Sequence, residues 1–156
     1  MPPQQTIKIM DITIDVIYDI ETLMEWRAEV IRAVFGIEPG KQLLDENRKF
    51  YERHLADGSH LALIARVDGR DVGCGNVCFY DEMPSPDNPA GRCAYIMNIY
   101  VRPPYRCNGI AHRLVARLAD VSRDLRCGKI YLETTDNAAP IYSSLGFRPM
   151  TNMMKL

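Results

Sequence analysis

The chain has 156 residues, 47% of them hydrophobic and 25% charged, which predicts one globular domain over residues 1–156 with a sizeable core. Its 19 basic and 20 acidic side chains leave a net charge of −1, which argues against a protein that binds nucleic acid or membrane surfaces through a positive field. There is neither a charged-then-apolar leader nor an apolar run of the ~20 residues that cross a bilayer. We therefore expect a cytoplasmic protein with no nucleic-acid partner and no membrane partner.

In the first half of the chain, the spacing of apolar residues indicates both strands and helices. Apolar residues alternate with polar ones in its strands and recur every three to four residues in its helices. Asp68-Gly69 tolerates the positive φ of a tight turn, and three prolines with a glycine exclude regular structure further on. The predicted elements are a strand over 6–16, helices over 21–36 and 43–58, a hairpin over 60–83 and a loop over 84–91.

The second half alternates strands and helices. Its first run, 92–101, is almost continuously apolar, which is typical of a strand buried on both faces. The predicted elements after it are a helix over 109–126, a strand over 129–135, a short helix over 139–147 and a last strand over 148–156. The whole order predicts an α/β fold, an α+β sandwich, with a mostly antiparallel first half. The strand, helix and strand in the second half should be parallel and right-handed.

The five cysteines are odd in number and lack the paired C-x-x-C spacing of a zinc site. Alternation places Cys74 and Cys78 on one face of a predicted strand, where a pair of buried thiols is the favoured interpretation. We therefore expect no metal and a reducing compartment.

A turn with one arginine, one glycine and little bulk, residues 106–111, stands directly before the amphipathic helix. The first amides of a helix lack partners, and its dipole adds positive charge there, so a phosphate satisfies both. Gly109 and Ala111 would allow its close approach, and Arg106 can add a charged contact. A plain strand-to-helix turn is the alternative. The run lacks the lysine and hydroxyl of a GxxxxGK[ST] loop and the glycines of GxGxxG.

The run "YRCNGIAHRLV" resembles the acyl-CoA-binding motif R/Q-x-x-G-x-G/A of the GCN5-related N-acetyltransferases, the GNAT family. Arg106, Gly109 and Ala111 stand at its defining positions. Upstream "YIMNIYV" is similar to the family's central strand, and downstream "YLETTDNAAPIYSSLGF" to its second signature. The resemblance implies the GNAT fold, with a mixed six- to seven-stranded sheet flanked by helices. It also implies an N-acetyltransferase that uses acetyl-CoA to acetylate a primary amine of a small molecule, an amino acid or a peptide.

The resemblance further implies which residues bind the coenzyme. Backbone groups of Ile99 and Val101 would bind the pantetheine arm at an open strand edge, and the amides of 107–112 would hold the pyrophosphate. Asn137 would fix the pantetheine end or a water, although it can also simply cap the next helix. The implied set is Ile99, Tyr100, Val101, Arg106, Cys107, Asn108, Gly109, Ile110, Ala111, His112 and Asn137. Two of them depart from the pattern, since Cys107 replaces a common glycine and Asn108 a usual basic residue.

The candidate catalytic groups are Tyr142 and Glu133, although Glu133 can equally be a solvated strand carboxylate, and Glu38 and Asp136 are weaker candidates for the base. Direct attack on the thioester needs a neutral amine and a proton for the leaving thiolate, which the resemblance implies Tyr142 supplies as general acid. A tyrosine that only packs on the sheet is the alternative. Tyr95 and Met97 occupy the places where some family members carry a strand base, and neither can serve. Glu133 is then the nearest acid, and a water chain is equally plausible. Cys107 as a covalent carrier is a sharper alternative.

The acceptor site is expected between the N-terminal helices and the proline-rich loop. Acids such as Glu29 or Glu82 would favour a cationic amine there. The candidate lining residues are Trp26, Glu29, Phe35, Asn47, Tyr51, Tyr80 and Asn98. A non-catalytic acyl-CoA sensor remains the alternative function because the strand base is missing. The methionine-rich end, 148–156, could offer a strand edge for a homodimer.

Overall fold

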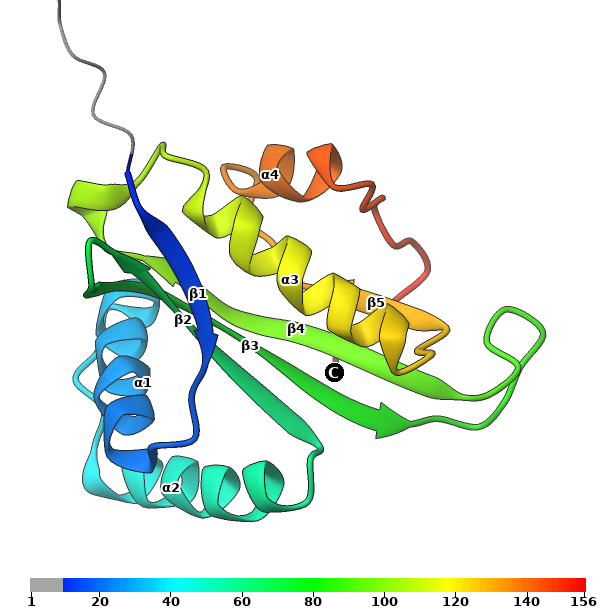
Figure 1. Ribbon diagram of the computed structural model, residues 1–156. Coiled ribbons are helices and arrows are strands. Elements are labelled where there is room, and N and C mark those ends of the chain that lie inside the picture. The colour runs from blue at the N-terminus through cyan, green and yellow to red at the C-terminus, as the bar shows by residue number, and fades with distance from the viewer. Residues whose placement is uncertain (1–9) are drawn as a thin grey trace, which may run out of the picture.

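The computed structural model of the protein describes residues 10–156 (Figure 1). Helices and strands follow one another in an order close to the predicted one. The elements are β1 (Ile12–Val16), α1 (Ile20–Phe35), α2 (Lys41–Ala56), β2 (His60–Val67), β3 (Arg70–Asp81), β4 (Arg92–Val101), the 3-10 helix η1 (Pro103–Tyr105), α3 (Ile110–Asp124), β5 (Lys129–Leu132) and α4 (Ala139–Ser144). Over this described range, no helix combines the length and apolarity that crossing a bilayer requires.

Local sequence signals account for several element ends. The Asp19 side chain accepts a 2.9 Å hydrogen bond from the Thr22 amide and so caps α1, and Gly36 ends that helix with a left-handed φ of 67°. At the β2–β3 turn, Asp68 and Gly69 have φ values of 50° and 79°. Two positive values in succession are the signature of the predicted tight hairpin turn, which is confirmed.

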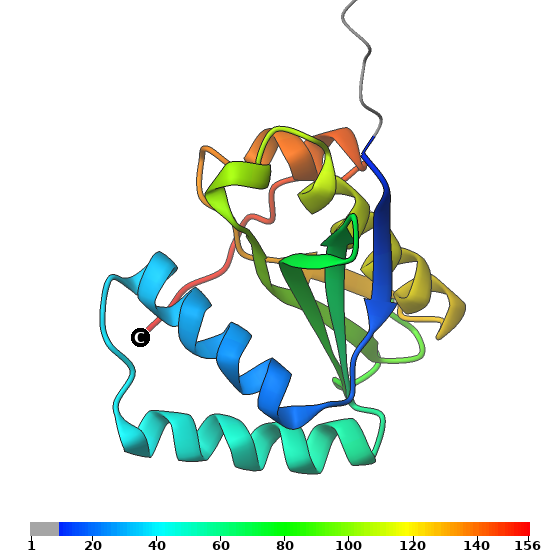
Figure 2. The same ribbon diagram turned by 60° about the vertical axis from the view of Figure 1, so that its left-hand side comes forward.

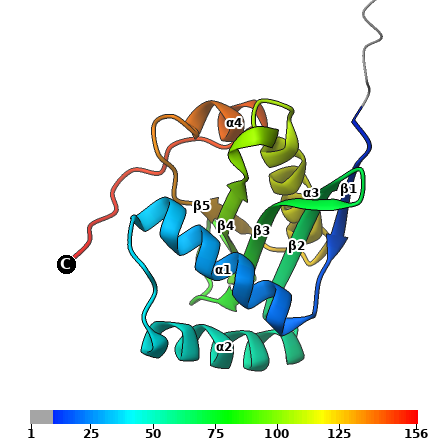
Figure 3. The ribbon, with the colours of Figure 1, turned by 90° about the vertical axis from the view of Figure 1, so that its left-hand side faces the viewer.

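The five strands form one sheet in the order β1-β2-β3-β4-β5. The first four strands are antiparallel, and β4 pairs with β5 in parallel across the α3 connection, as predicted. Helices α1 and α2 cover one face, and α3 and α4 cover the other (Figures 1 and 3). The predicted α/β sandwich is therefore confirmed. Cys74 and Cys78 both lie on the face that α1 and α2 cover, but only Cys74 is buried, so the predicted pair of buried thiols is wrong for Cys78, which is half-buried at a pocket.

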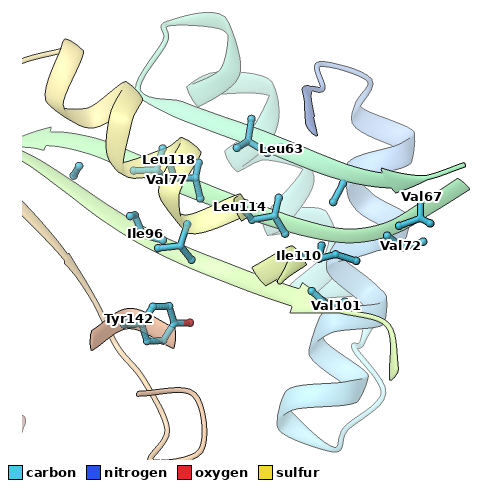
Figure 4. Close-up of a cluster of buried hydrophobic side chains, with 13 residues drawn as sticks. Leu63, Val67, Val72, Val77, Ile96, Val101, Ile110, Leu114, Leu118 and Tyr142 are labelled. Atoms are coloured by element: carbon cyan, nitrogen blue, oxygen red, sulfur yellow. The ribbon is translucent and has the colours of Figure 1, made fainter. Parts of the chain in front are cut away.

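The larger part of the core lies between α3 and the sheet (Figure 4). Ile110, Leu114 and Leu118 recur every four residues on α3 and are at most 2% exposed. They pack with strand residues such as Val77 and Ile96, and each fully buried aliphatic side chain contributes about 1.5–3 kcal/mol. This packing fixes α3, and with it the turn before the helix, against β4.

The predicted last strand is wrong, and with it the count of six to seven strands. Residues 148–156 form no strand and are exposed, and they leave α4 toward the side of the sheet that carries α1 (Figures 2 and 3). Pro149 lacks the amide that a ladder hydrogen bond needs, and no strand of the described range pairs with this segment. Of the predicted first strand, residues 12–16 are confirmed, and residues 6–9 lie outside the described range.

A bulge interrupts β4 where it faces β3. Met97 pairs with Asn76 and Tyr100 with Cys74, so Asn98 and Ile99 together face Gly75. Asn98 has a left-handed φ of 58° in this bulge. The bulge shifts the alternation of β4, so that Ile99 packs on the α3 side whereas Met97 stays on the α2 side.

Strands β4 and β5 pair over only four residues each, from Cys93 with Lys129 to Ile96 with Leu132. Beyond this point β4 continues to Val101, paired with β3 alone. Within the described chain, residues 97–101 therefore have one edge that no strand covers. This is the open strand edge that the resemblance implied.

Candidate active site

The turn before α3 leaves the first amides of the helix available. Gly109 enters the helix with a left-handed φ of 76°, and no side chain caps α3. A Cβ placed on Gly109 would meet nothing within 4 Å, so the space in front of the turn is open. The side-chain Nδ2 of Asn108 donates to the backbone carbonyls of Tyr105 and Arg106, at 3.1 and 3.0 Å, and these hydrogen bonds stabilise the conformation of the turn. An uncapped helix start with open space ahead is suited to an anion.

The residues of the turn divide by exposure. Ile110 is buried against the sheet and anchors the helix start, whereas Cys107, Gly109 and His112 are exposed beside it. Cys107 has a φ of 62°, so the chain adopts a left-handed conformation here where the family commonly has glycine. The backbone of the turn, more than its side chains, is thus what a ligand would meet.

Arg106 points back toward the open edge of β4. Its Nε donates a 2.8 Å hydrogen bond to the carbonyl of Val101, and its guanidinium lies 5.7 Å from the centre of the Tyr100 ring. The Val101 carbonyl is one of the groups that the resemblance assigns to the pantetheine arm. A carbonyl oxygen has two lone pairs, so Arg106 and a ligand amide can share it.

Backbone direction separates the three predicted residues of β4. The Arg102 amide donates to the Val72 carbonyl of β3, at 2.9 Å, so Arg102 and Tyr100 direct their backbone groups at β3. Ile99 and Val101 face the opposite, uncovered edge. The structure thus brings Ile99 and Val101 to the open edge but not the backbone of Tyr100, whose ring packs edge-on against Trp26.

Tyr142 lies on α4 beside this edge. Figure 4 shows it on the far side of β4 from Leu63, and its ring packs in the core cluster, edge-on to Phe147. The residue is 9% exposed, and burial raises the pKa of its hydroxyl above the ordinary value. A phenol with a raised pKa stays protonated at neutral pH, as a general acid requires.

Glu133 and Asn137 stand in the segment between β5 and α4. Glu133 directly follows the last residue of β5, where the two strands diverge, and it is exposed. It lies near Tyr95, whose pKa is raised by burial and by the negative charge of Glu133. Asn137 is exposed too, and its alternative role as a helix cap is wrong, because Ala138 takes the cap position of α4.

A pocket of about 260 Å³ opens on the other face of the sheet, between α1, α2 and the strands, and reaches β4 at its bulge. Three of the expected acceptor-site residues line it, Asn47, Tyr51 and Asn98. The full lining is Arg27, Asn47, Phe50, Tyr51, His60, Asn76, Cys78, Tyr95, Met97 and Asn98. This pocket and the open edge of β4 thus share two residues of one strand, Met97 and Asn98.

Four expected acceptor residues lie elsewhere, as does the acid Glu82. Two of them, Trp26 and Glu29, contact Arg102, Trp26 through its ring at 4.3 Å and Glu29 through its carboxylate at 2.8 Å. Phe35 is 64% exposed at the end of α1, while Tyr80 contacts Tyr131 and Glu82 pairs with Lys129. Glu29 and Glu82 are therefore ion-paired with Arg102 and Lys129, and neither adds negative charge to the pocket.

Arg27 and His60 are two of the seven lining residues that the sequence did not point to as acceptor residues. His60 is 4% exposed, and burial lowers its pKa to about 4. Arg27 follows the buried Leu23 by four positions and precedes the buried Ile31 by four, so it stands within the apolar stripe of α1. A charged residue at an apolar-periodic position is the signal that could have found it.

Comparison with known proteins identifies the family of this chain. A model of the acetyltransferase (GNAT) family matches residues 20–147. The chain is 30% identical over 88 residues to a glucosamine 6-phosphate N-acetyltransferase from Trypanosoma brucei brucei, and 36% identical over 64 residues to a thialysine N-epsilon-acetyltransferase from Sus scrofa. These matches cover 56% and 39% of this chain, but only 58% and 38% of the two relatives.

A solved structure extends the likeness over nearly the whole chain. A predicted acetyltransferase with acetyl-CoA, from Clostridium acetobutylicum, superimposes with a TM-score of 0.82 at 27% identity. The match covers 95% of this chain and 96% of that one. These relatives are all named as acetyltransferases, and the Clostridium protein was solved with acetyl-CoA. The chain belongs to the GNAT family of acetyltransferases.

Proposed function

We propose that this protein transfers the acetyl group of acetyl-CoA to a primary amine by direct attack of the amine on the thioester. The observation that carries the proposal is the uncovered edge of β4 over residues 97–101. It lies between the uncapped start of α3 and the pocket under α1 and α2. A thioester laid along this edge would have an anion site at one end and an acceptor pocket at the other.

Coenzyme binding would use mainly backbone groups. The amides of residues 107–112 would bind the diphosphate, since the helix start offers unpaired N–H groups and about half a positive charge. Ile99 and Val101 would bind the pantetheine arm as an added strand does, and Asn137 would approach its far end from the segment before α4. Arg106 would bridge the two parts, because it already contacts Val101 from the turn.

Acetyl transfer needs three groups at the place where β4 and β5 diverge. An alkylamine of pKa ~10.4 is about three units above neutral pH, so freeing its lone pair costs about 4 kcal/mol. Glu133, or water beside it, would take the amine proton as the C–N bond forms and the C–S bond breaks. The amide of Ile99 would polarise the carbonyl, and Tyr142 would protonate the leaving sulfur and recover its proton from solvent.

The test is release of CoA thiol from acetyl-CoA in the presence of an amine panel that includes glucosamine 6-phosphate and thialysine. We expect at least one amine to raise thiol release well above the rate in buffer, with the acetylated amine detected by mass spectrometry. A protein that binds acetyl-CoA and releases no thiol with any amine would instead be a sensor. Glu133→Gln distinguishes Glu133 from a water chain as the base. The rate should fall if Glu133 is the base and stay unchanged if a water chain is.

A further inference from the structure

The pocket under α1 and α2 contains a guanidinium with no carboxylate partner. Arg27 is half-buried, and among residues 10–156 no carboxylate oxygen lies within 4 Å of it. The other half-buried arginines in the same range are all ion-paired, Arg48 with Glu21, Arg66 with Asp15 and Asp71, and Arg102 with Glu29. Withdrawing a cation from water without a counter-ion is unfavourable, so this exception needs a reason.

Two neutral amide oxygens hold the Arg27 side chain in place. Its Nε donates to Asn47 Oδ1 at 3.0 Å, and its Nη1 donates to Asn98 Oδ1 at 2.9 Å. These bonds use two of the five N–H groups of the guanidinium, which leaves three donors in a planar fork. Amide oxygens orient the fork but leave its charge uncompensated.

A chain of hydrogen bonds fixes these partners in turn. Asn98 Nδ2 donates to Asn76 Oδ1 at 2.9 Å, and Asn76 Nδ2 bonds to His60 Nε2 at 2.8 Å. Because Nε2 must accept from the Asn76 amide, Nδ1 carries the proton and faces Cys78 Sγ at 3.3 Å. The network has one arrangement of donors and acceptors, and it holds Arg27 at the bulge of β4.

The remaining lining residues are uncharged at neutral pH. Burial raises the pKa of Tyr51 to about 12 and that of Cys78 to about 11, and it lowers the pKa of His60 to about 4. Asparagine, phenylalanine and methionine side chains complete the lining together with Tyr95, whose pKa is also raised. Arg27 is thus the one charged group among the residues that line this pocket.

We propose that Arg27 binds an oxyanion of the acceptor, a carboxylate or a phosphate, so that the substrate is a small amine that also carries a negative group. A planar guanidinium with free donors matches either oxyanion in a two-point contact. The volume of about 260 Å³ lies below the ~300 Å³ at which drug-sized sites begin, which favours a metabolite-sized acceptor. This assignment rests on the proposed acetyl transfer, and it places the anionic end at Arg27 and the amine toward the thioester.

Matched acceptor pairs test the proposal in the unmodified protein. Lysine is compared with cadaverine, which lacks only the carboxylate, and glucosamine 6-phosphate with glucosamine, which lacks only the phosphate. We expect the anionic member of at least one pair to have a kcat/KM about 10- to 100-fold higher, the range of one charged hydrogen-bonded contact, mainly through KM. The pair that responds distinguishes carboxylate from phosphate. Equal values within both pairs, or higher values for the members that lack the anionic group, would overturn the proposal.

Variants then assign the effect to one side chain. Arg27→Met should reduce kcat/KM for the acceptor with the anionic group to that of the pair member without it, and leave the value for that second member nearly unchanged. Arg53→Met, at an exposed position of α2, is the matched control and should change neither. An equal loss for both members of a pair in a folded Arg27→Met protein would contradict anion binding and indicate a structural role.

Calorimetry separates failure of this proposal from failure of the proposed function. Protein loaded with CoA is titrated with each member of the pairs. If no amine causes thiol release but the anionic member binds and Arg27→Met removes that binding, acetyl transfer is refuted and the anion site stands. If thiol release occurs without any preference for anionic acceptors, the anion site is refuted and acetyl transfer stands.

Discussion

Glu29 on α1 and Arg102 at the end of β4 form a two-point ion pair, with Arg102 Nε and Nη2 at 2.9 and 2.8 Å from the two carboxylate oxygens. The Arg102 guanidinium also lies 4.3 Å from the centre of the Trp26 ring, and its Nη1 donates to the Asp71 carbonyl. The pair therefore joins α1, β3 and β4 next to the bulge. It is a structural clamp at the rim of the site, and it does not face the acceptor pocket.

From this geometry we expect Glu29→Gln to leave the KM for the amine acceptor unchanged. The substitution should lower the free energy of unfolding by about 1 kcal/mol, because both partners are partly exposed and solvent screens the pair. The measurements are acceptor kinetics and urea denaturation of the same preparation. A clear rise in acceptor KM with unchanged stability would return Glu29 to the acceptor site.

Gly109 gives a direct test of the anion site. We expect Gly109→Glu to raise the Kd for acetyl-CoA at least 100-fold, because it places bulk and like charge where the diphosphate would lie. Gly109→Ala should keep most of the affinity and lose only about 1 kcal/mol of stability to the left-handed φ. Gly36→Ala, also at a positive φ with open space around it, controls for that strain at the end of a different helix, α1.

Unchanged affinity in Gly109→Glu would show that the coenzyme does not lie across the start of α3. Calorimetry with CoA and with pantetheine, which carries no phosphate, separates loss of the diphosphate contact from loss of the whole site. We expect the Gly109→Glu variant to lose the difference between these two ligands, since only CoA carries the diphosphate.

The sequence could predict those parts of the site that depend on local backbone conformation. Gly109 has the left-handed φ that a glycine before a helix suggests, and Asp68-Gly69 forms the hairpin turn that the pair favours. The open edge at Ile99 and Val101 followed from a resemblance, because nothing in the apolar run "YIMNIYV" shows that β5 pairs with only its first part.

The parts that depend on packing between distant segments could not be predicted. The place of Arg27 in the apolar stripe of α1 can be seen in the sequence, but its partners on α2 and at the β4 bulge, 20 and 71 residues away along the chain, cannot. In the sequence Glu29 looks like an unpaired acid, because its partner Arg102 lies 73 residues further along the chain. The last strand failed for a related reason, because the composition of 148–156 does not reveal that no neighbouring strand pairs with it.

Tyr142→Phe should reduce kcat about 100-fold, within the range for a lost general acid, and leave the Kd for acetyl-CoA nearly unchanged. The hydroxyl forms no hydrogen bond within the described residues, so its removal should change stability by less than about 1 kcal/mol. Because the pKa of Tyr142 is raised, the acid form persists to the alkaline end of the rate profile. Tyr105→Phe, in the 3-10 helix, is the matched control. Equal kcat in both variants would leave Tyr142 as a packing residue.

His60 should make the stability of the protein depend on pH between its unfolded pKa of about 6.5 and its folded pKa of about 4. Since burial lowers the folded pKa, the unfolded chain binds the proton first, and stability is full above pH 6.5 and falls as the pH decreases toward 4. We expect this residue to remove about 2 kcal/mol between pH 7 and pH 5, measured by urea denaturation at both values. His60→Gln should abolish that part of the pH dependence, whereas His112→Gln, at an exposed position, should retain it. The same slope in wild type and His60→Gln would show that His60 is not buried in its neutral form, and the donor order of the network that holds Arg27 would then have to be reversed.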